Sequence, residues 1–390
     1  MIEILSRKLN MKELEEIGLK VAQFAEVVDQ KAKFPEESIR LLKEHKLLSA
    51  YIPTSLGGQG MNIVELVEIG KVLGKSCAST GMIWAMHQTQ VACLVHHSLD
   101  SEAICNSLRN IAENEYLIAS ITSEVGTGGD IGRSIAGLDL EGNYGFLTKK
   151  GSVVSYGNYA EAFLATAKKS KDANETNQSL VLLNRDDMEI EQTSEWDTLG
   201  MRGTCSPGFT IKAKFSLNHV LNLPYRDIST QTMVPFSHIL WSSVWYGIAN
   251  EAFMKARKLS KIRMKNLLRN GNQNYEDTKL VTIHHKLNLM QNNLEKYTLE
   301  YADLTEDLKL NVDMLNSLDF SLQINNLKVI SSELAVEIVQ NSLFLCGFSG
   351  FQNNNKFSVG RNLRDILSSV VMIHNDRLNK TSSSLLLLQR

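Results

Sequence analysis

The chain has 390 residues, of which 43% are hydrophobic and 22% charged, which is typical of a globular protein long enough for two or three domains and argues against disorder. Its 41 lysine and arginine residues nearly balance its 43 aspartate and glutamate residues, for a formal net charge of -2. No global field would therefore hold the protein on nucleic acid or on an anionic bilayer, and a small molecule is the expected partner.

The cysteines and the start of the chain bear on location. The five cysteines are odd in number, widely spaced and without a CxxC pair, which argues against a disulfide framework and against a zinc or other metal site. We expect mostly buried thiols in a reducing compartment. The N-terminal sequence mixes Glu with Lys and lacks the apolar core of a signal peptide, and no apolar run is predicted to span a membrane. The cytoplasm is the predicted location.

The first region, residues 1–116, shows helical periodicity. Apolar residues recur at intervals of three and four and form one stripe, which indicates an amphipathic helix; they are Leu14, Ile17, Val21, Phe24 and Val28. Pro35 suits the first turn of a second helix, and acidic residues follow it. Further helices are predicted over 63–73 and 81–95.

The second region, residues 117–226, changes to short β-prone runs separated by Gly, Asn, Asp and Ser. These runs predict an antiparallel barrel or sandwich inserted between two helical regions. The predicted strands are 117–121, 144–150, 162–168, 180–184 and 209–215.

In the third region, residues 227–390, the helical pattern returns. One long helix is indicated by an apolar face made of Leu327, Ile330, Leu334 and Ile338. No proline follows Pro235, which suits long uninterrupted bundle helices. The segments NQNYED (272–277) and FQNNNK (351–356) are predicted to be loops.

Three segments carry candidate chemistry. In ITSEVGTGGD (121–130), three glycines allow backbone N–H groups to approach a ligand closely. WDTLGMRGTCSPG (196–208) predicts a tight crossing between strands around a buried Trp196. GIANEAFMKARKLSKIR (247–263) predicts a helix with a small-residue face that ends at Arg263.

In this order and at these separations, the segments resemble the signatures of the acyl-CoA dehydrogenase superfamily. SVVSYG (152–157) is similar to the family's strand beside the flavin, and CGFSGF (346–351) with RNLRD (361–365) resembles its paired-glycine turn and arginine-aspartate pair. The resemblance covers essentially the whole chain. It implies a mostly α member of the α+β class, with an N-terminal helical domain, a middle antiparallel β-barrel or sandwich and a C-terminal four-helix bundle.

The resemblance also implies a noncovalent flavin, FAD in most relatives, with FMN as the alternative for a monooxygenase. Ile121, Thr122 and Ser155 would contact the ring system, and Arg263 would reach the cofactor of a neighbouring subunit. A site shared in this way implies a homotetramer or homodimer. The glycines expected at the cofactor are Gly128, Gly129, Gly347 and Gly350.

The sequence departs from the family at the catalytic base. A dehydrogenase needs a carboxylate that removes the α-proton of a thioester while the flavin accepts hydride. The two places where relatives carry this glutamate correspond to Ile373 and Ser237. The remaining candidate catalytic residues are Asp376 as a base, and His374 and His87 as proton-handling groups.

Three functions therefore stay open. The first is dehydrogenation of an acyl thioester, carried by CoA or a carrier protein, with a separate electron acceptor. The second is a flavin-dependent monooxygenase supplied with reduced flavin by a reductase. The third is a noncatalytic protein that binds flavin or acyl-CoA.

Overall fold

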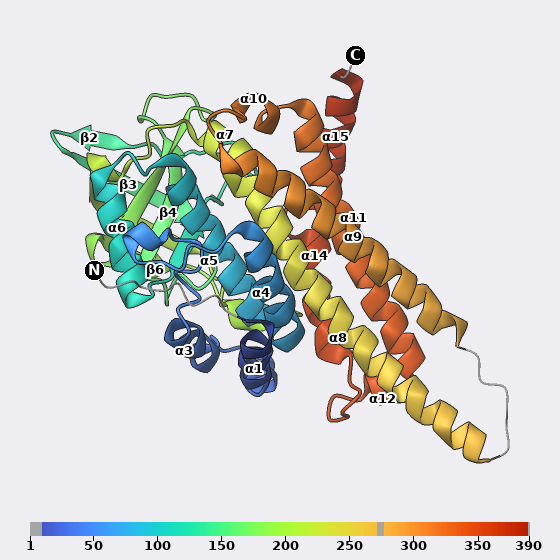
Figure 1. The fold of residues 1–390 in the computed structure, drawn as a ribbon. Helices are drawn as coiled ribbons and strands as arrows, with labels where there is room; N and C mark the ends of the chain where they lie inside the picture. Colours follow the sequence, from blue (N-terminus) through green and yellow to red (C-terminus); the bar gives the residue numbers. More distant parts are fainter. Residues whose placement is uncertain (1–9, 271–276, 389–390) are drawn as a thin grey trace, which may run out of the picture.

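The computed structural model describes residues 10–270 and 277–388, in which helices, then strands, then helices follow along the chain (Figure 1). The helices are α1 (Met11–Ala22), α2 (Ala25–Lys31), α3 (Glu36–Glu44), α4 (Ile63–Ser76), α5 (Ala78–His97), α6 (Glu102–Asn114), α7 (Tyr225–Ile228), α8 (Val234–Arg269), α9 (Thr278–Glu306), α10 (Val312–Leu315), α11 (Leu318–Cys346), α12 (Phe348–Phe351), α13 (Gly360–Ile366), α14 (Ser368–Val371) and α15 (Asn375–Leu388). The strands are β1 (Ile118–Ile121), β2 (Asp139–Glu141), β3 (Tyr144–Gly151), β4 (Ala162–Lys168), β5 (Gln178–Asn184), β6 (Met188–Gln192) and β7 (Phe209–Ser216).

The N-terminal helices begin where their sequences offer caps. The side chain of Asn10 caps α1, whose predicted stripe is buried at Leu14, Ile17 and Val21. The single stripe to Val28 is divided in two, because the chain turns at residues 23–24 between α1 and α2. Asn62 and Glu65 form a capping box at the start of α4.

The strands form two sheets, one with the order β1-β4-β5 and one with the order β2-β3-β7-β6. The predicted antiparallel pairing holds for every pair except β1 and β4, which run parallel. β4 and β5 are buried on both faces, whereas β3 and β7 alternate between buried and more exposed residues. The second sheet therefore packs one face on the core and turns the other to solvent.

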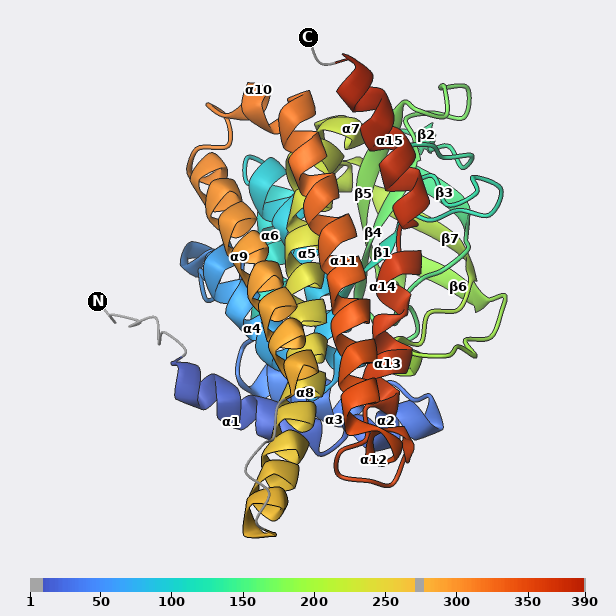
Figure 2. The ribbon, with the colours of Figure 1, turned by 90° about the vertical axis from the view of Figure 1, so that its right-hand side faces the viewer.

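The long C-terminal helices α8, α9 and α11 lie side by side, and α8 packs against α4 and α5. The axes of α8, α9 and α11 run nearly parallel, and α13, α14 and α15 lie on the side of α11 that faces away from α9 (Figure 2). Small residues allow a close approach to the N-terminal helices: a Cβ at Gly247 of α8 would lie 2.2 Å from the carbonyl oxygen of Lys71 in α4. The small-residue face predicted for α8 therefore packs on α4.

One helix of the described residues, α11, is long and apolar enough to cross a membrane by length and composition, and 44% of its most apolar window is buried. The sequence predicts this long helix but no run that spans a membrane, and the charged residues Lys328 and Glu333 interrupt its apolar face. α11 packs against α8 and α9 within the bundle (Figure 2).

The structure bears on the predictions for Trp196 and for the two predicted loops. Trp196 is only partly buried, not buried as predicted, because it lies at the edge of a cavity described below. The FQNNNK segment is a turn between α12 and α13, as predicted. Most of NQNYED lies outside the described residues.

Candidate functional site

A cavity of about 400 Å³ opens where the β region meets helices from both ends of the chain. This volume falls within the range of about 300–1,000 Å³ typical of ligand pockets. Its walls come from four segments that are far apart in sequence and are largely apolar. The lining residues are Met82, Met86, Val153, Ser155, Trp196, Thr198, Leu199, Gly200, Met201, Thr204, Ser206, Arg364, Leu367, Ser368, Val371 and Met372.

Three of the hydroxyl groups in the cavity wall lie close together. The Ser206 hydroxyl donates to Oγ of Ser155 at 2.8 Å, and it lies 2.9 Å from Oγ1 of Thr204. Ser155 belongs to the SVVSYG segment, whereas Thr204 and Ser206 belong to the 196–208 segment. The hydroxyls therefore connect two predicted signature segments at the cavity wall.

The 196–208 segment is fixed to α13 by a buried carboxylate. Oδ1 of Asp365 accepts a hydrogen bond of 2.7 Å from the backbone N–H of Met201. Burial raises the pKa of Asp365 to about 6, although this hydrogen bond and the nearby Arg361 favour the charged form. A Cβ at Gly200 would lie 2.0 Å from the carbonyl oxygen of Arg364, so only glycine permits this close approach.

The glycine-rich segment 121–130 forms a loop held from both sides. Gly126, Gly128 and Gly129 have φ values of 98°, 62° and 78°, a conformation that glycine adopts without strain. The Arg377 guanidinium of α15 donates to the carbonyl oxygens of Gly128, at 2.6 Å, and of Gly129. The C-terminal helix therefore contacts the loop directly.

A buried ion pair anchors the other side of this loop. Glu124 accepts hydrogen bonds from Nζ of Lys149 at 3.1 Å, from the Ser134 hydroxyl and from the N–H groups of Ile135 and Ala136. Burial favours the neutral carboxyl, but the charge of Lys149 and the hydrogen bonds outweigh it, so the pKa of Glu124 is lowered. Burial also lowers the pKa of Lys149.

The three residues predicted to contact a ring system are placed differently from one another. Ser155 lines the cavity. Thr122 is partly buried with its hydroxyl 3.3 Å from that of Ser120, and the side chain of Ile121 is fully buried in the core. Of these three side chains, Ser155 is the one that reaches the cavity wall.

His87 is fully buried and bonded to the backbone at both ring nitrogens. Nδ1 accepts from the N–H of Ile118 at 3.0 Å, so Nε2 carries the proton donated to the carbonyl oxygen of Leu48 at 2.7 Å. Burial lowers the pKa of His87 to about 4, which keeps the ring neutral at physiological pH. The residue joins α5 to β1 and is not part of the cavity lining.

Residues 371–376, which include the catalytic candidates His374 and Asp376, lie at the rim of the cavity. Val371 and Met372 line the cavity, Ile373 has a φ of 46°, and His374 and Asp376 point to solvent. A positive φ at a β-branched residue is strained. Neither His374 nor Asp376 lies in the cavity wall, and their catalytic roles stay predictions.

Arg263 is bonded to the end of α11. Its guanidinium donates to the carbonyl oxygens of Leu345 at 2.7 Å and of Cys346 at 3.1 Å, where it offsets the negative end of the helix dipole. Gly347 follows with a φ of 61° and open space around its Cα, whereas Gly350 is buried. Arg263, which was predicted to reach a neighbouring subunit's cofactor, thus lies beside two glycines predicted at the cofactor, and none of the three lines the cavity.

The helical walls of the cavity are not predicted by any motif in the sequence. Met82 and Met86 lie four residues apart on α5, and Leu367, Ser368 and Val371 come from the α13–α14 region. The spacing of the two methionines marks one helix face but does not say what that face meets.

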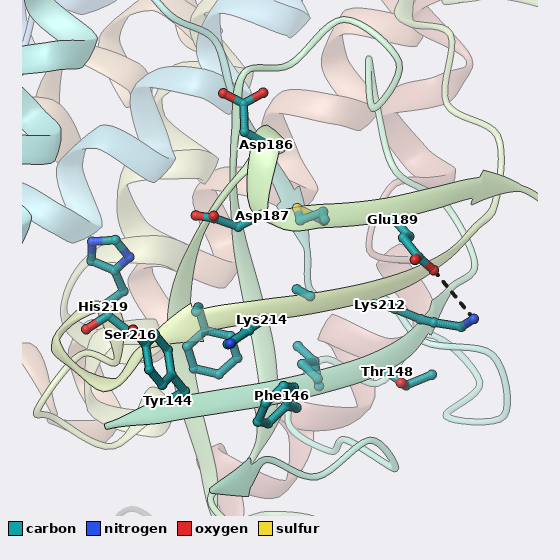
Figure 3. Close-up of a pocket in the computed structure, with 14 residues that line it drawn as sticks. Tyr144, Phe146, Thr148, Asp186, Asp187, Glu189, Lys212, Lys214, Ser216 and His219 are labelled. Carbon is teal, nitrogen blue, oxygen red and sulfur yellow. Dashed lines mark ion pairs between the residues drawn. The ribbon is translucent and has the colours of Figure 1, made fainter. Parts of the chain in front are cut away.

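A larger groove of about 830 Å³ lies on the outer face of the second sheet (Figure 3). It is an open surface made by β3, β6 and β7, on which Lys212 pairs with Glu189 at 3.6 Å and Nζ of Lys214 lies 4.4 Å from the centre of the Tyr144 ring. Lys212, Glu189 and Lys214 thus already contact a partner of opposite charge or an aromatic ring. It shares no residue with the cavity, and we place the functional site at the cavity.

Comparison with known proteins agrees with this architecture. Residues 16–115 match the family described as acyl-CoA dehydrogenase, N-terminal domain. The chain is 24% identical over 185 residues, 47% of its length and 49% of the relative's, to the probable acyl-CoA dehydrogenase YngJ of Bacillus subtilis. It is 26% identical over 136 residues, 35% of its length and 31% of the relative's, to the oxygenase component of p-hydroxyphenylacetate 3-hydroxylase of Acinetobacter baumannii. The chain thus spans half or less of the length of these curated relatives.

Among solved structures, FMN-bound TdsC of Paenibacillus sp. A11-2 aligns with a TM-score of 0.81 at 16% identity, over 97% of this chain and 98% of that one. Identity this low speaks for the fold alone. The likeness covers the helical, β and helical regions together, which confirms the predicted fold class. The chain therefore has an acyl-CoA dehydrogenase-like fold, and its residues 16–115 match the N-terminal domain of that family.

Proposed function

We propose that the protein is a flavin-dependent oxidoreductase that binds the flavin ring system at the cavity. The cavity wall fits a flat aromatic ring, because apolar side chains such as Met82, Val153 and Trp196 surround a small set of hydroxyls. Ser155 and Ser206 would offer hydrogen bonds to the polar edge of the ring. The 124–130 loop, with its glycine backbone, would lie near the remainder of the cofactor. A bound flavin supplies two-electron redox chemistry and, when reduced, reaction with oxygen.

The observation that favours one chemistry is that, among the described residues, the cavity wall contains no carboxylate and Arg364 is its one charged residue. Removal of an α-proton from a thioester requires a base within hydrogen-bonding reach of that proton. We therefore favour a monooxygenase, in which one oxygen atom enters the substrate and the other leaves as water. A separate reductase would supply the reduced flavin. The p-hydroxyphenylacetate hydroxylase component among the relatives supports this choice.

Oxygen consumption tests this proposal. Purified protein is mixed with reduced FMN or FAD under limiting oxygen, with and without candidate aromatic and acyl substrates. The proposal predicts about one oxygenated product per oxygen consumed only when protein and substrate are both present, because reduced flavin alone consumes oxygen and converts it to hydrogen peroxide. Release of all the oxygen as hydrogen peroxide with every substrate would contradict it.

A second candidate, dehydrogenation of an acyl thioester with FAD, has its own support. Residues 16–115 match the N-terminal domain of acyl-CoA dehydrogenases, and His374 and Asp376 follow Ile373 at the cavity rim. Movement of residues 372–376 would be needed to carry either side chain toward the cavity. The substrate would be linked to CoA or to a carrier protein, and a separate acceptor would take the electrons.

We further propose a homotetramer or homodimer in the cytoplasm. Arg263 and Gly347 lie together at the end of α11, beside the exposed aromatic side chains of Phe344, Phe348 and Phe351. This surface could contribute to the cofactor site of a second copy. Analytical ultracentrifugation with and without flavin would measure the assembly.

A further inference from the structure

A buried lysine lies in the bundle close to the segment that lines the cavity. Lys328 of α11 has no exposed surface, and its Nζ donates to Oδ1 of Asn375 at 2.6 Å. A buried ammonium group is costly unless it is paired or hydrogen-bonded. Within residues 10–270 and 277–388 it forms no ion pair with a carboxylate, so the bond to Asn375 is its polar contact at close range.

Asn375 connects this lysine to the cavity rim. It is the first residue of α15 and comes directly after Ile373 and His374. Its Nδ2 donates to Oγ of Ser332 at 3.1 Å and to Oε1 of Glu333 at 3.3 Å. The strained φ of Ile373 persists only if the surrounding structure holds the backbone in place. The bonds from α11 to Asn375 provide this hold on one side.

The indole of Trp245 in α8 lies near Lys328 but does not accept a hydrogen bond from its ammonium group. Nζ lies 5.8 Å from the centre of the Trp245 ring, and the indole N–H of Trp245 is buried without a hydrogen-bond partner among the described residues. An indole N–H only donates hydrogen bonds. The indole N–H therefore cannot accept a hydrogen bond from the ammonium group, and Oδ1 of Asn375 remains its acceptor.

We propose that Lys328 is a positioning residue that acts through Asn375 to hold residues 371–374 at the rim of the cavity and thereby places His374. The assignment of the cavity as a reaction site rests on the proposed function, whereas the hold on the segment does not. Lys328 touches neither the cavity nor its contents. Its effect on the reaction comes from the position of the backbone that it fixes.

The strength of this hold depends on pH. Burial lowers the pKa of Lys328 to about 8, and Glu333 on the same helix opposes this shift. Burial lowers the pKa of His238, which faces Lys328 from α8, to about 3, so that ring is neutral. From α15 the facing group is the neutral amide of Asn375. The charge-assisted hydrogen bond is therefore present below about pH 8 and weakens above it.

Hydrogen exchange followed by mass spectrometry tests the proposal. Peptides from residues 368–380 are compared between pH 7 and pH 9.5, with correction for intrinsic exchange from peptides of α9. In the natural protein, protection of 371–376 should fall several-fold above about pH 8. Lys328→Met should show the low protection at both values, and Lys328→Arg should restore part of it at pH 9.5.

A second variant keeps the test independent of folding defects in Lys328→Met. Asn375→Asp places a carboxylate beside the ammonium, which should raise the midpoint of the pH dependence by about one unit or more. An unchanged midpoint in Asn375→Asp, or protection of 371–376 that does not vary with pH in the natural protein, would overturn the proposal. The exchange is measured without flavin, so a failure of flavin binding would count against the proposed function and not against this hold.

Discussion

The hydroxyl of Ser155 is the predicted ring contact that the structure places in the cavity wall, 2.8 Å from that of Ser206. Ser155→Ala removes one hydrogen-bond partner from the proposed flavin and leaves the cavity shape nearly unchanged. Loss of one such bond corresponds to about 0.5–1.5 kcal/mol, or roughly a 2- to 12-fold weaker affinity. A titration of flavin with the protein, followed by flavin fluorescence, measures this change in affinity. Ser107→Ala on α6 is the control, and equal affinities in the two variants would contradict the assignment.

At the scale of single residues, the sequence indicates which side chains belong to a motif better than it indicates where those side chains lie in the fold. Ser155 was found because it lies in a recognisable signature, and the glycines of the 121–130 loop were found because their backbone freedom is visible in the letters. The buried state of Ile121 and the backbone bonds of His87 depend on contacts with distant segments. The pattern of neighbouring residues does not encode such contacts.

The loop that carries the glycines depends on the buried pair between Glu124 and Lys149, whose side chains are 5% and 0% exposed. Glu124→Gln leaves a buried ammonium without its charge partner, which should lower the free energy of unfolding by about 3–5 kcal/mol. Chemical denaturation at pH 7 measures the loss. Glu189→Gln breaks an exposed pair with Lys212 and should change the same quantity by less than about 1 kcal/mol.

The pH dependence of this pair has a definite sign. The pKa of Glu124 is lowered in the folded state, so its contribution is present above the ordinary carboxyl pKa and is lost as pH falls through the lower folded value. The difference in stability between the natural protein and Glu124→Gln should therefore shrink under acid. A difference that stays constant down to the acid transition would show that charge is not its origin.

At the scale of elements, the sequence predicted strands with strong β propensity and missed weak ones. The runs that became β1, β3, β4, β5 and β7 were all predicted. β2 and β6 are short, partly or fully exposed strands rich in acidic residues, so neither hydrophobicity nor alternation distinguishes them from loops. The parallel pairing of β1 with β4 is set by the connection between them, which propensity does not describe.

At the scale of the whole molecule, Lys328 makes the free energy of unfolding depend on pH. This free energy should rise with pH, whereas the hold of Lys328 on residues 371–374 should weaken. Its pKa falls from an ordinary 10.5 to about 8 in the folded state, so between these values the unfolded chain binds more protons. Folding stability should then rise with pH over this window, by up to roughly 3 kcal/mol relative to Lys328→Met. Denaturant titrations of both proteins at pH 7.5 and 10 measure the change. A constant difference would contradict a lowered pKa.

The order of regions and the fold class could be predicted from the sequence, because helical and strand periodicities change sharply near residues 117 and 227. The cavity could not, because its wall combines α5, the 152–157 and 196–208 segments and the α13–α14 region. Which faces of these elements meet is decided by packing across the whole chain. The domain boundaries at 116 and 226 stay predictions.

In the proposed function, the cavity holds a flavin and, among the described residues, has no carboxylate base in its wall. The most direct measurement is an anaerobic titration of the flavin-reconstituted protein with a panel of acyl-CoA thioesters, following flavin absorbance. If the protein is a monooxygenase, the flavin stays oxidised with every thioester, and chemically reduced flavin on the protein reacts once oxygen and substrate are admitted. Bleaching by one thioester would refute the monooxygenase proposal and establish dehydrogenation, with Asp376 and His374 as the first residues to replace.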